Sequence, residues 1–171
     1  PRIGGGSSGI SQCPPHEVGR VKMGENFQGK LFMQQRTHEL SVSTRGRGLH
    51  NINGAIVDWV AKQGMTTGLL TVFIRHTSAS LVVQENADPD VLRDLDAYLT
   101  RLVPDGDPQY RHDAEGADDM PAHIRSALTQ TQIAIPLVGG RLTLGTWQDV
   151  YLFEHRTAGH RRRVVLHLLG E

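Results

Sequence analysis

The sequence predicts an α+β fold: a single, β-rich domain built on a mixed sheet with about three helices. Several segments alternate apolar and polar residues or form short aliphatic runs, which is typical of strands. Three other segments space their apolar residues as helices do, between capping residues and a glycine or proline. With 171 residues and no internal repeat, the chain is long enough for one domain with a buried core.

The first 30 residues are interpreted as a flexible leader, because they contain G-G-G-S-S-G and few residues suited to a core. Part of this leader can derive from an expression vector. The folded domain is expected over residues 31–171. Its first strand spans about 31–44, where apolar and polar residues alternate as they do near a sheet edge, and the sequence R-G-R-G then ends it. That glycine-rich segment lacks the spacing of a phosphate loop, so an ordinary turn is favoured.

The middle of the chain predicts two helices and two strands. Asn51 or Asn53 can cap a helix that ends at Gly64, and strands follow at about 66–76 and 79–85. Asp88-Pro89 begins the next helix, which continues to Pro104. The apolar stripes that place these helices against a core are Ile52, Ile56, Trp59 and Val60 in the first, and Val91, Leu92, Leu95, Leu99 and Leu102 in the second.

The last third combines a long loop, one helix and several strands. Residues 104–117 form a polar, acidic loop, and loops of this length are often functional. Asp118 or Asp119 is expected to cap a helix that runs to about Leu128. A hairpin turning at Gly139-Gly140 follows, and then strands over about 149–156 and 163–169.

Composition excludes several classes of protein. The 18 basic and 18 acidic residues balance, which argues against a dedicated nucleic-acid binder. No apolar run approaches the roughly 20 residues that span a bilayer, so no membrane association is expected. The single cysteine, Cys13, excludes an internal disulfide framework. A reduced, cytoplasmic setting is the expectation.

Four polar segments carry the residues suited to chemistry. They are residues 75–86, 110–112 and 118–123, and residues 145–148 together with 154–156, and we expect the fold to bring them together. Their histidines end strands or begin a helix beside carboxylates, and three imidazoles with an open fourth position describe a catalytic metal site. The four candidate ligands are His76, His112, His123 and His155, and the carboxylates that can orient them are Glu85, Asp118, Asp119 and Glu154.

Two other interpretations of these segments remain. The four histidines can be unrelated structural residues, since no local spacing such as H-E-x-x-H joins them. A Ser/His hydrolase can be built from His76 with Ser78 or Ser80, but G-x-S-x-G is missing and neighbouring strand residues point to opposite faces. A metal or binding site is therefore favoured over a hydrolase.

Long blocks of the chain resemble one family. The motifs H-T-S-A-S-L, E-N-A-D-P-D-V, Y-R-H-D-A-E-G-A-D-D-M-P-A-H-I, G-R-L-T-L-G-T-W-Q and R-R-V-V-L-H-L-L-G-E occur in the order seen in the YjbQ family. This family is also called the secondary thiamine-phosphate synthase enzyme family. The resemblance implies an α+β homotrimer with a histidine-rich pocket that holds a divalent metal. Zinc is the metal expected there, and magnesium is the alternative if the substrate is a diphosphate. It also implies a weak thiamine-phosphate synthase activity.

The resemblance assigns roles by matched block. Catalytic candidates are His155, Glu85, Asp119 and Glu154; substrate-binding candidates are Arg75, Asn86, Thr146, Trp147, Gln148 and Arg156; metal candidates are His76, His112 and His123. The two arginines are the nearest cations for a diphosphate. The chain departs from the family pattern at Asp149, where a glycine is expected, and at His160, where a small residue is usual. Asp149 adds charge beside the expected pocket.

Two functions of different class follow. The first is a metal-dependent transferase or hydrolase acting on a small phosphorylated or heterocyclic substrate. The second is a non-catalytic trimer that holds a small ligand or a metal in the same pocket. Both require the same polar residues, so the sequence does not separate them.

Overall fold

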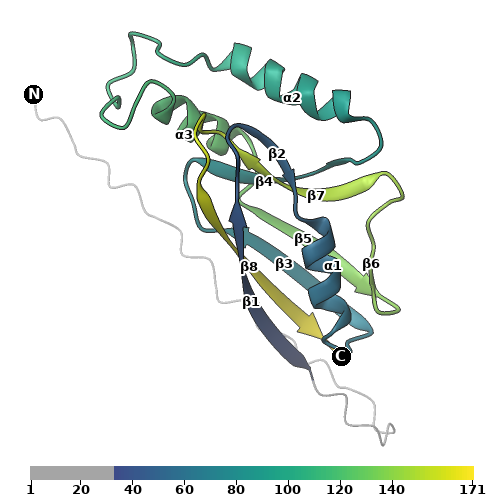
Figure 1. Ribbon diagram of the computed structural model, residues 1–171. Coiled ribbons are helices and arrows are strands. Elements are labelled where there is room, and N and C mark those ends of the chain that lie inside the picture. The colour runs from purple at the N-terminus through teal and green to yellow at the C-terminus, as the bar shows by residue number, and fades with distance from the viewer. Residues whose placement is uncertain (1–32) are drawn as a thin grey trace, which may run out of the picture. The chain divides into compact units, whose positions relative to one another are not determined.

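The strands pair into two antiparallel sheets in the computed structural model, which describes residues 33–171 (Figure 1). The larger sheet has five strands in the order β1-β8-β3-β5-β6. Their bounds are β1 Gln34–Ser43, β8 Arg161–Gly170, β3 Thr67–Ile74, β5 Gln132–Val138 and β6 Arg141–Leu142. The strand nearest the C-terminus therefore lies between two strands from the first half of the chain.

The smaller sheet has three strands in the order β2-β7-β4, with β2 Gly48–Asn51, β7 Gln148–Glu154 and β4 Ala79–Glu85. In the β4–β7 register, Ala79 pairs with Glu154 at one end and Glu85 pairs with Gln148 at the other. Six residues separate these pairs along each strand, which at the rise of a β-strand is about 20 Å. Two groups of candidate site residues lie at these opposite ends of the sheet.

The core lies between one face of the five-stranded sheet, the three-stranded sheet and helix α1 (Asn53–Ala61). Alternate residues of β3, β5 and β8 point into it, as the period of two in a strand requires. Helix α1 contributes Ile52, Ile56 and Val60, which are at most 5% exposed. The predicted apolar stripe of this helix is thus its buried face.

Helices α2 (Pro89–Leu102) and α3 (Asp119–Leu128) lie on the opposite side of the three-stranded sheet from α1 in the ribbon (Figure 1). Asp88 caps α2, since its carboxylate accepts a hydrogen bond from the Asp90 N–H at 2.8 Å. Ser126 of α3 donates to the Ala79 carbonyl at 3.1 Å. This contact places α3 against the start of β4, so we call the Ala79–Glu154 end of the small sheet the α3 end and the Glu85–Gln148 end the α1 end.

No element among residues 33–171 covers the other face of the five-stranded sheet. Leu69 and Phe73 of β3 are 44% and 43% exposed there, and Leu169 of β8 is 38% exposed. Val138 of β5 is 61% exposed. Apolar side chains this exposed on adjacent strands form a patch of the kind found at protein interfaces.

The predicted α+β class and the three helices are confirmed, but the sheet arrangement differs from the prediction. A single mixed sheet was expected, whereas the described strands form two antiparallel sheets. Strand β2 was not predicted, since only its first residue, Gly48, belongs to the expected turn, and β6 is only two residues long. These features depend on pairing between strands distant in sequence, such as β1 with β8, which local periodicity does not encode.

The predicted leader, residues 1–30, lies outside the described residues. Among residues 33–171, no helix combines the length and the apolar composition needed to cross a membrane.

Candidate functional site

The N-terminus of α3 is held in place by Arg156, which follows strand β7. The Arg156 side chain donates from Nε to Asp118 Oδ2 at 3.2 Å, from Nη1 to Asp119 Oδ1, and from Nη2 to the Glu115 carbonyl at 2.7 Å. Asp118 also accepts from the Thr157 N–H and hydroxyl at 2.7 and 2.9 Å. We call this group the Arg156 clamp: Arg156 and Thr157 against Glu115, Asp118 and Asp119.

The clamp changes the expected role of Asp118. Its side chain makes no helix-capping hydrogen bond, because its carboxylate faces Arg156 and Thr157 instead. Burial alone would raise the pKa of Asp118, but the hydrogen bonds from Thr157 and the charge of Arg156 outweigh it and lower the pKa to about 2. Asp118 is therefore a charged anchor for the acidic loop.

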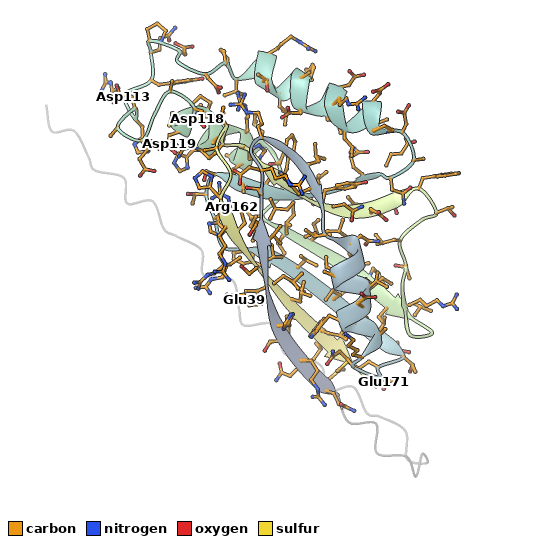
Figure 2. The ribbon with its side chains drawn as sticks, in the orientation of Figure 1. Glu39, Asp113, Asp118, Asp119, Arg162 and Glu171 are labelled. Carbon is orange, nitrogen blue, oxygen red and sulfur yellow. The ribbon has the colours of Figure 1, made fainter. Side chains whose placement is uncertain are left out.

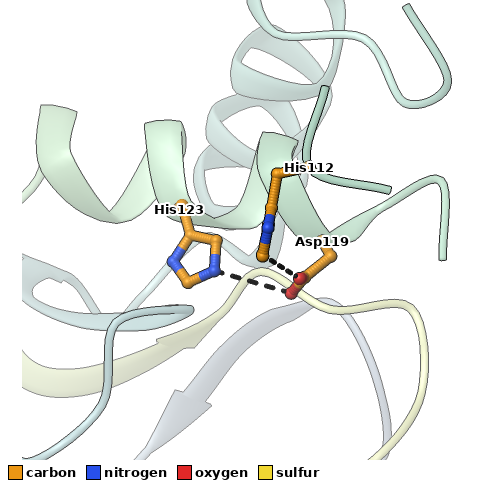
Figure 3. Close-up of side chains that lie close together, drawn as sticks. All are labelled: His112, Asp119 and His123. Atoms are coloured by element: carbon orange, nitrogen blue, oxygen red, sulfur yellow. Dashed lines mark ion pairs between the residues drawn. The ribbon is translucent and has the colours of Figure 1, made fainter. Parts of the chain in front are cut away.

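Asp119 is the centre of a cluster with two histidines (Figure 3). Its side chain is 3% exposed and faces His112 from the loop and His123 from the next turn of α3. His112 Nε2 lies 2.8 Å from Asp119 Oδ2, and His123 Nε2 lies 3.7 Å from Asp119 Oδ1. The nitrogen of His112 is close but badly aligned, so Asp119 Oδ2 is buried without a hydrogen bond.

The tautomer of His123 follows from its other ring nitrogen. Nδ1 lies 3.0 Å from the carbonyl oxygen of Thr77. A carbonyl can only accept, so Nδ1 carries the proton and Nε2 of the neutral ring carries a lone pair. That lone pair faces the Asp119 carboxylate, and two electron-rich groups in this position are stabilised by a cation between them.

The three residues fit a metal ion. One ligand atom from each of His112, Asp119 and His123 lies within 4.8 Å of the others. Two imidazoles and a carboxylate are a donor set suited to zinc, and three protein ligands leave a fourth position for water or substrate. The Thr77 carbonyl orients His123 as an outer partner of a ligand does.

The structure does not bring His76 into this cluster. His76 Nε2 accepts a hydrogen bond from the Arg163 N–H at 2.8 Å, and Nδ1 lies 3.5 Å from the Arg162 guanidinium. Both ring nitrogens thus face hydrogen-bond donors. Asp119, predicted as a catalytic residue, occupies the place in the cluster that the sequence prediction gave to His76.

Glu154 belongs to a buried ion pair. Its side chain is fully buried. The carboxylate accepts hydrogen bonds from Arg162 Nε at 2.7 Å and Arg162 Nη2 at 2.6 Å, and from the Thr44 hydroxyl at 2.9 Å. Arg162 is labelled in Figure 2. Burial alone would raise the pKa of Glu154, but hydrogen bonds from Arg162 and the Arg156 N–H lower it. A paired carboxylate inside the protein is a structural element and is not exposed to a substrate in this conformation.

His155 is also buried. It is 0% exposed, and its Nε2 lies 2.8 Å from Ser80 Oγ, which is equally buried. Burial, together with nearby Arg125, lowers the pKa of His155 to about 3, so the ring is neutral at physiological pH. The Ser80–His155 pair resembles a nucleophile and base, but it has no surface through which a substrate could reach it.

The remaining candidates lie in two other places. Three of them, Asn86, Thr146 and Gln148, line a pocket of about 520 Å³ at the α1 end of the small sheet. Glu85 is the strand partner of Gln148 at the same end, and the side chain of Trp147 is 64% exposed. Arg75 forms an ion pair with Glu39 at 2.8 Å and lines a separate hollow with His76. The four polar segments therefore do not converge on one site within the chain.

Sequence reasoning missed the clamp and the position of Asp119 between the two histidines. Asp119 and His123 are four residues apart on a helix, a spacing that puts both side chains on one face. That spacing was a signal for the pair. The contact with His112 depends on the path of the acidic loop, which no local pattern specifies.

Comparison with known proteins identifies the family. The family described as UPF0047 protein YjbQ-like matches residues 38–171. The chain is 56% identical over 138 residues to the UPF0047 protein sll1880 of Synechocystis, covering 81% of this chain and 94% of that protein. It is 43% identical over 133 residues to the UPF0047 protein YjbQ of Escherichia coli O157:H7, covering 77% and 96%.

Solved structures agree with the fold. The hypothetical protein APE1520 from Aeropyrum pernix K1 superposes with a TM-score of 0.73 at 32% identity, covering 80% of this chain and 99% of that one. A YbjQ-like protein from Sulfolobus solfataricus P2 superposes with a TM-score of 0.75 at 23% identity, covering 82% and 100%. The second comparison concerns the fold alone.

The buried, neutral His155 predicts how stability depends on pH. The unfolded chain protonates this residue below its ordinary pKa of 6.5, whereas the folded chain does so only near 3. Between these values the unfolded state binds more protons, so the free energy of unfolding falls as pH is lowered, by up to about 1.4 kcal/mol per pH unit. Urea unfolding between pH 5 and 6.5, where carboxylates stay charged, measures this slope.

The matched variant is His155→Gln, which keeps a nitrogen able to reach Ser80 but does not titrate. The free energy of unfolding of this variant should depend on pH less steeply than that of the wild type. The difference in slope should correspond to about one proton fewer taken up on unfolding. Equal slopes in the two proteins would show that His155 is protonated in the folded state.

Proposed function

We propose a function for this chain, which belongs to the UPF0047 family of YjbQ-like proteins: it is a metal-binding enzyme acting on a small phosphorylated or heterocyclic substrate. The metal is zinc, and its ligands are His112, Asp119 and His123. One observation supports this most strongly. Two imidazoles face the Asp119 carboxylate, and one oxygen of that carboxylate is buried without a hydrogen bond. Leaving a buried carboxylate oxygen without a hydrogen bond is costly, and a metal ion bound to that oxygen would remove the cost.

The surroundings of the three ligands support a catalytic role over a purely structural one. His112 is 52% exposed at its side chain and His123 32%, so the open side of the cluster faces solvent. Asp119 is fixed by Arg156, and His123 by the Thr77 carbonyl. When bound, zinc would supply a Lewis acid that polarises a phosphoryl or carbonyl oxygen and lowers the pKa of a bound water.

The reaction we propose is a slow thiamine-phosphate synthase activity, as the family resemblance implies. It joins a pyrimidine methyl diphosphate to a thiazole phosphate with release of pyrophosphate. Arg75 is the candidate cation for the diphosphate, because its side chain is 54% exposed and, among residues 33–171, forms an ion pair with Glu39 alone. Arg156 is less suited to bind a diphosphate, because its guanidinium already donates to the residues of the clamp and its side chain is only 11% exposed. Magnesium can accompany the diphosphate as a second metal.

One observation favours a second function, a non-catalytic protein that binds a small ligand or metal. The candidate acid-base residues His155 and Glu154 are fully buried and engaged by Ser80 and Arg162. The cluster then has few groups besides its own ligands to move a proton. Binding without turnover would follow from this.

We also propose that the chain assembles as a homotrimer through the uncovered face of the five-stranded sheet. Leu69, Phe73, Val138 and Leu169 are 38–61% exposed on that face, and burying them would be favourable. Multi-angle light scattering at micromolar concentration should give three times the mass of one chain. A mass of one chain would contradict the proposal, and Phe73→Lys should lower the measured mass if this face is the interface.

Zinc content tests the ligand assignment. After loading with zinc and desalting, wild-type protein should retain about one zinc per chain, whereas His112→Ala and His123→Ala should retain much less, because each loses one of three ligands. Elemental analysis gives the content, and His167→Ala, on a strand of the large sheet, is the matched control that should load like wild type. Full zinc content in both ligand variants would refute the assignment.

Turnover separates the two functions. The zinc-loaded protein should form thiamine phosphate with a kcat below about 1 s⁻¹, the low end for dedicated enzymes. His123→Ala should abolish the activity. Saturable binding of either substrate with no product would support the binding protein, and a kcat far above this value would show that the activity is the main one.

A further inference from the structure

A second hollow lies apart from the cluster of His112, Asp119 and His123. It has a volume of about 520 Å³ and lies at the α1 end of the small sheet. One side is apolar and formed by Val57, Val60 and Ala61 of α1 with Leu142 and Leu144 from the segment after β5. Walls of this kind enclose the carbon body of a small ligand.

The polar side is built around Asp149 of β7. Its Oδ1 accepts hydrogen bonds from Asn53 Nδ2 at 2.9 Å and Asn86 Nδ2 at 3.1 Å, and its Oδ2 accepts from Asn51 Nδ2 at 2.7 Å. These carboxamides come from the start of α1, the end of β4 and the end of β2. Three separate elements therefore fix the orientation of one carboxylate.

The groups nearest Asp149 are bonded within the protein. Asn86 Nδ2 also lies 3.4 Å from the Thr146 carbonyl, and the Gln148 Oε1 accepts from the Gly145 N–H at 2.9 Å. A carboxylate offers about four lone-pair positions, and the three carboxamides occupy three of them. The polar side thus offers acceptors, chiefly the fourth position on Asp149 and the carbonyl oxygen of Asn86.

The charge of Asp149 is not compensated by an ion pair among residues 33–171. Its three hydrogen-bond partners are neutral amides. Arg141 lines the same pocket but forms no ion pair with Asp149 there. A group that brings both positive charge and N–H donors would match the Asp149 carboxylate, which an anion placed there would oppose.

We infer that this pocket is a second ligand site, which takes a small molecule with a flat, apolar body and a cationic amidine-type head. The body lies between α1 and the Leu142–Leu144 segment, and the head donates to Asp149. The site shares no residue with the metal cluster and is about a strand length away from it. The inference therefore does not depend on the metal or on the proposed reaction.

Benzamidine and benzoate are suitable probes, because they share a ring and differ in the charge of the head. In two-dimensional ¹⁵N NMR titrations of the full chain with EDTA present, benzamidine should shift the side-chain amides of Asn53 and Asn86 and the backbone amide of Gly145. Benzoate should leave these signals unchanged. Equal affinity for the two probes, or no shift at these positions with benzamidine, would overturn the inference.

Two variants test the two sides of the pocket. Asp149→Asn should weaken benzamidine binding at least tenfold, because it removes the charge while keeping the size of the side chain. Val57→Trp should also weaken it at least tenfold by filling the apolar side, and since Val57 is 42% exposed on α1, folding and the Asp149 contacts should persist. Wild-type affinity in Val57→Trp would place benzamidine elsewhere and refute the site.

Discussion

The interaction on which the candidate site depends is the clamp between Arg156 and the start of α3. Three groups from one guanidinium hold Glu115, Asp118 and Asp119, so a loop of low intrinsic order is fixed to the end of β7. Asp119 is thereby directed toward His112 and His123. The preceding residues, Glu154 and His155, point into the protein, where Arg162 pairs with Glu154 and Ser80 Oγ lies 2.8 Å from His155 Nε2.

Most of the fold could be predicted from local pattern. The α2 start followed from Asp88-Pro89, and the buried stripe of α1 from the spacing of Ile52, Ile56 and Val60. The two-sheet arrangement could not, because β8 pairs with β1 and β3, which are distant in sequence. Arg125 shows a similar limit: it is 1% exposed within a helix, since its guanidinium reaches the Val103 carbonyl and Asp105.

The candidate site was predictable in its residue types and less so in its geometry. The sequence predicted His76, His112 and His123 as metal ligands and Asp119 as a catalytic residue. The structure gathers the last three, whereas His76 faces Arg162 and the Arg163 N–H. It also placed all polar segments in one pocket. The β4–β7 register puts the pocket around Asp149 and the cluster of His112, Asp119 and His123 at opposite ends of the same small sheet, a separation that only strand pairing determines.

The central claim is that Asp119, held by Arg156, completes a zinc site with two histidines. An anomalous difference map, recorded at the zinc absorption edge from crystals grown with zinc, tests it most directly. The account predicts one strong peak bonded to His112 Nε2, His123 Nε2 and an oxygen of Asp119, at about 2.0–2.2 Å from each. A peak bonded to His76 or His155, or no peak between these three side chains, would contradict it.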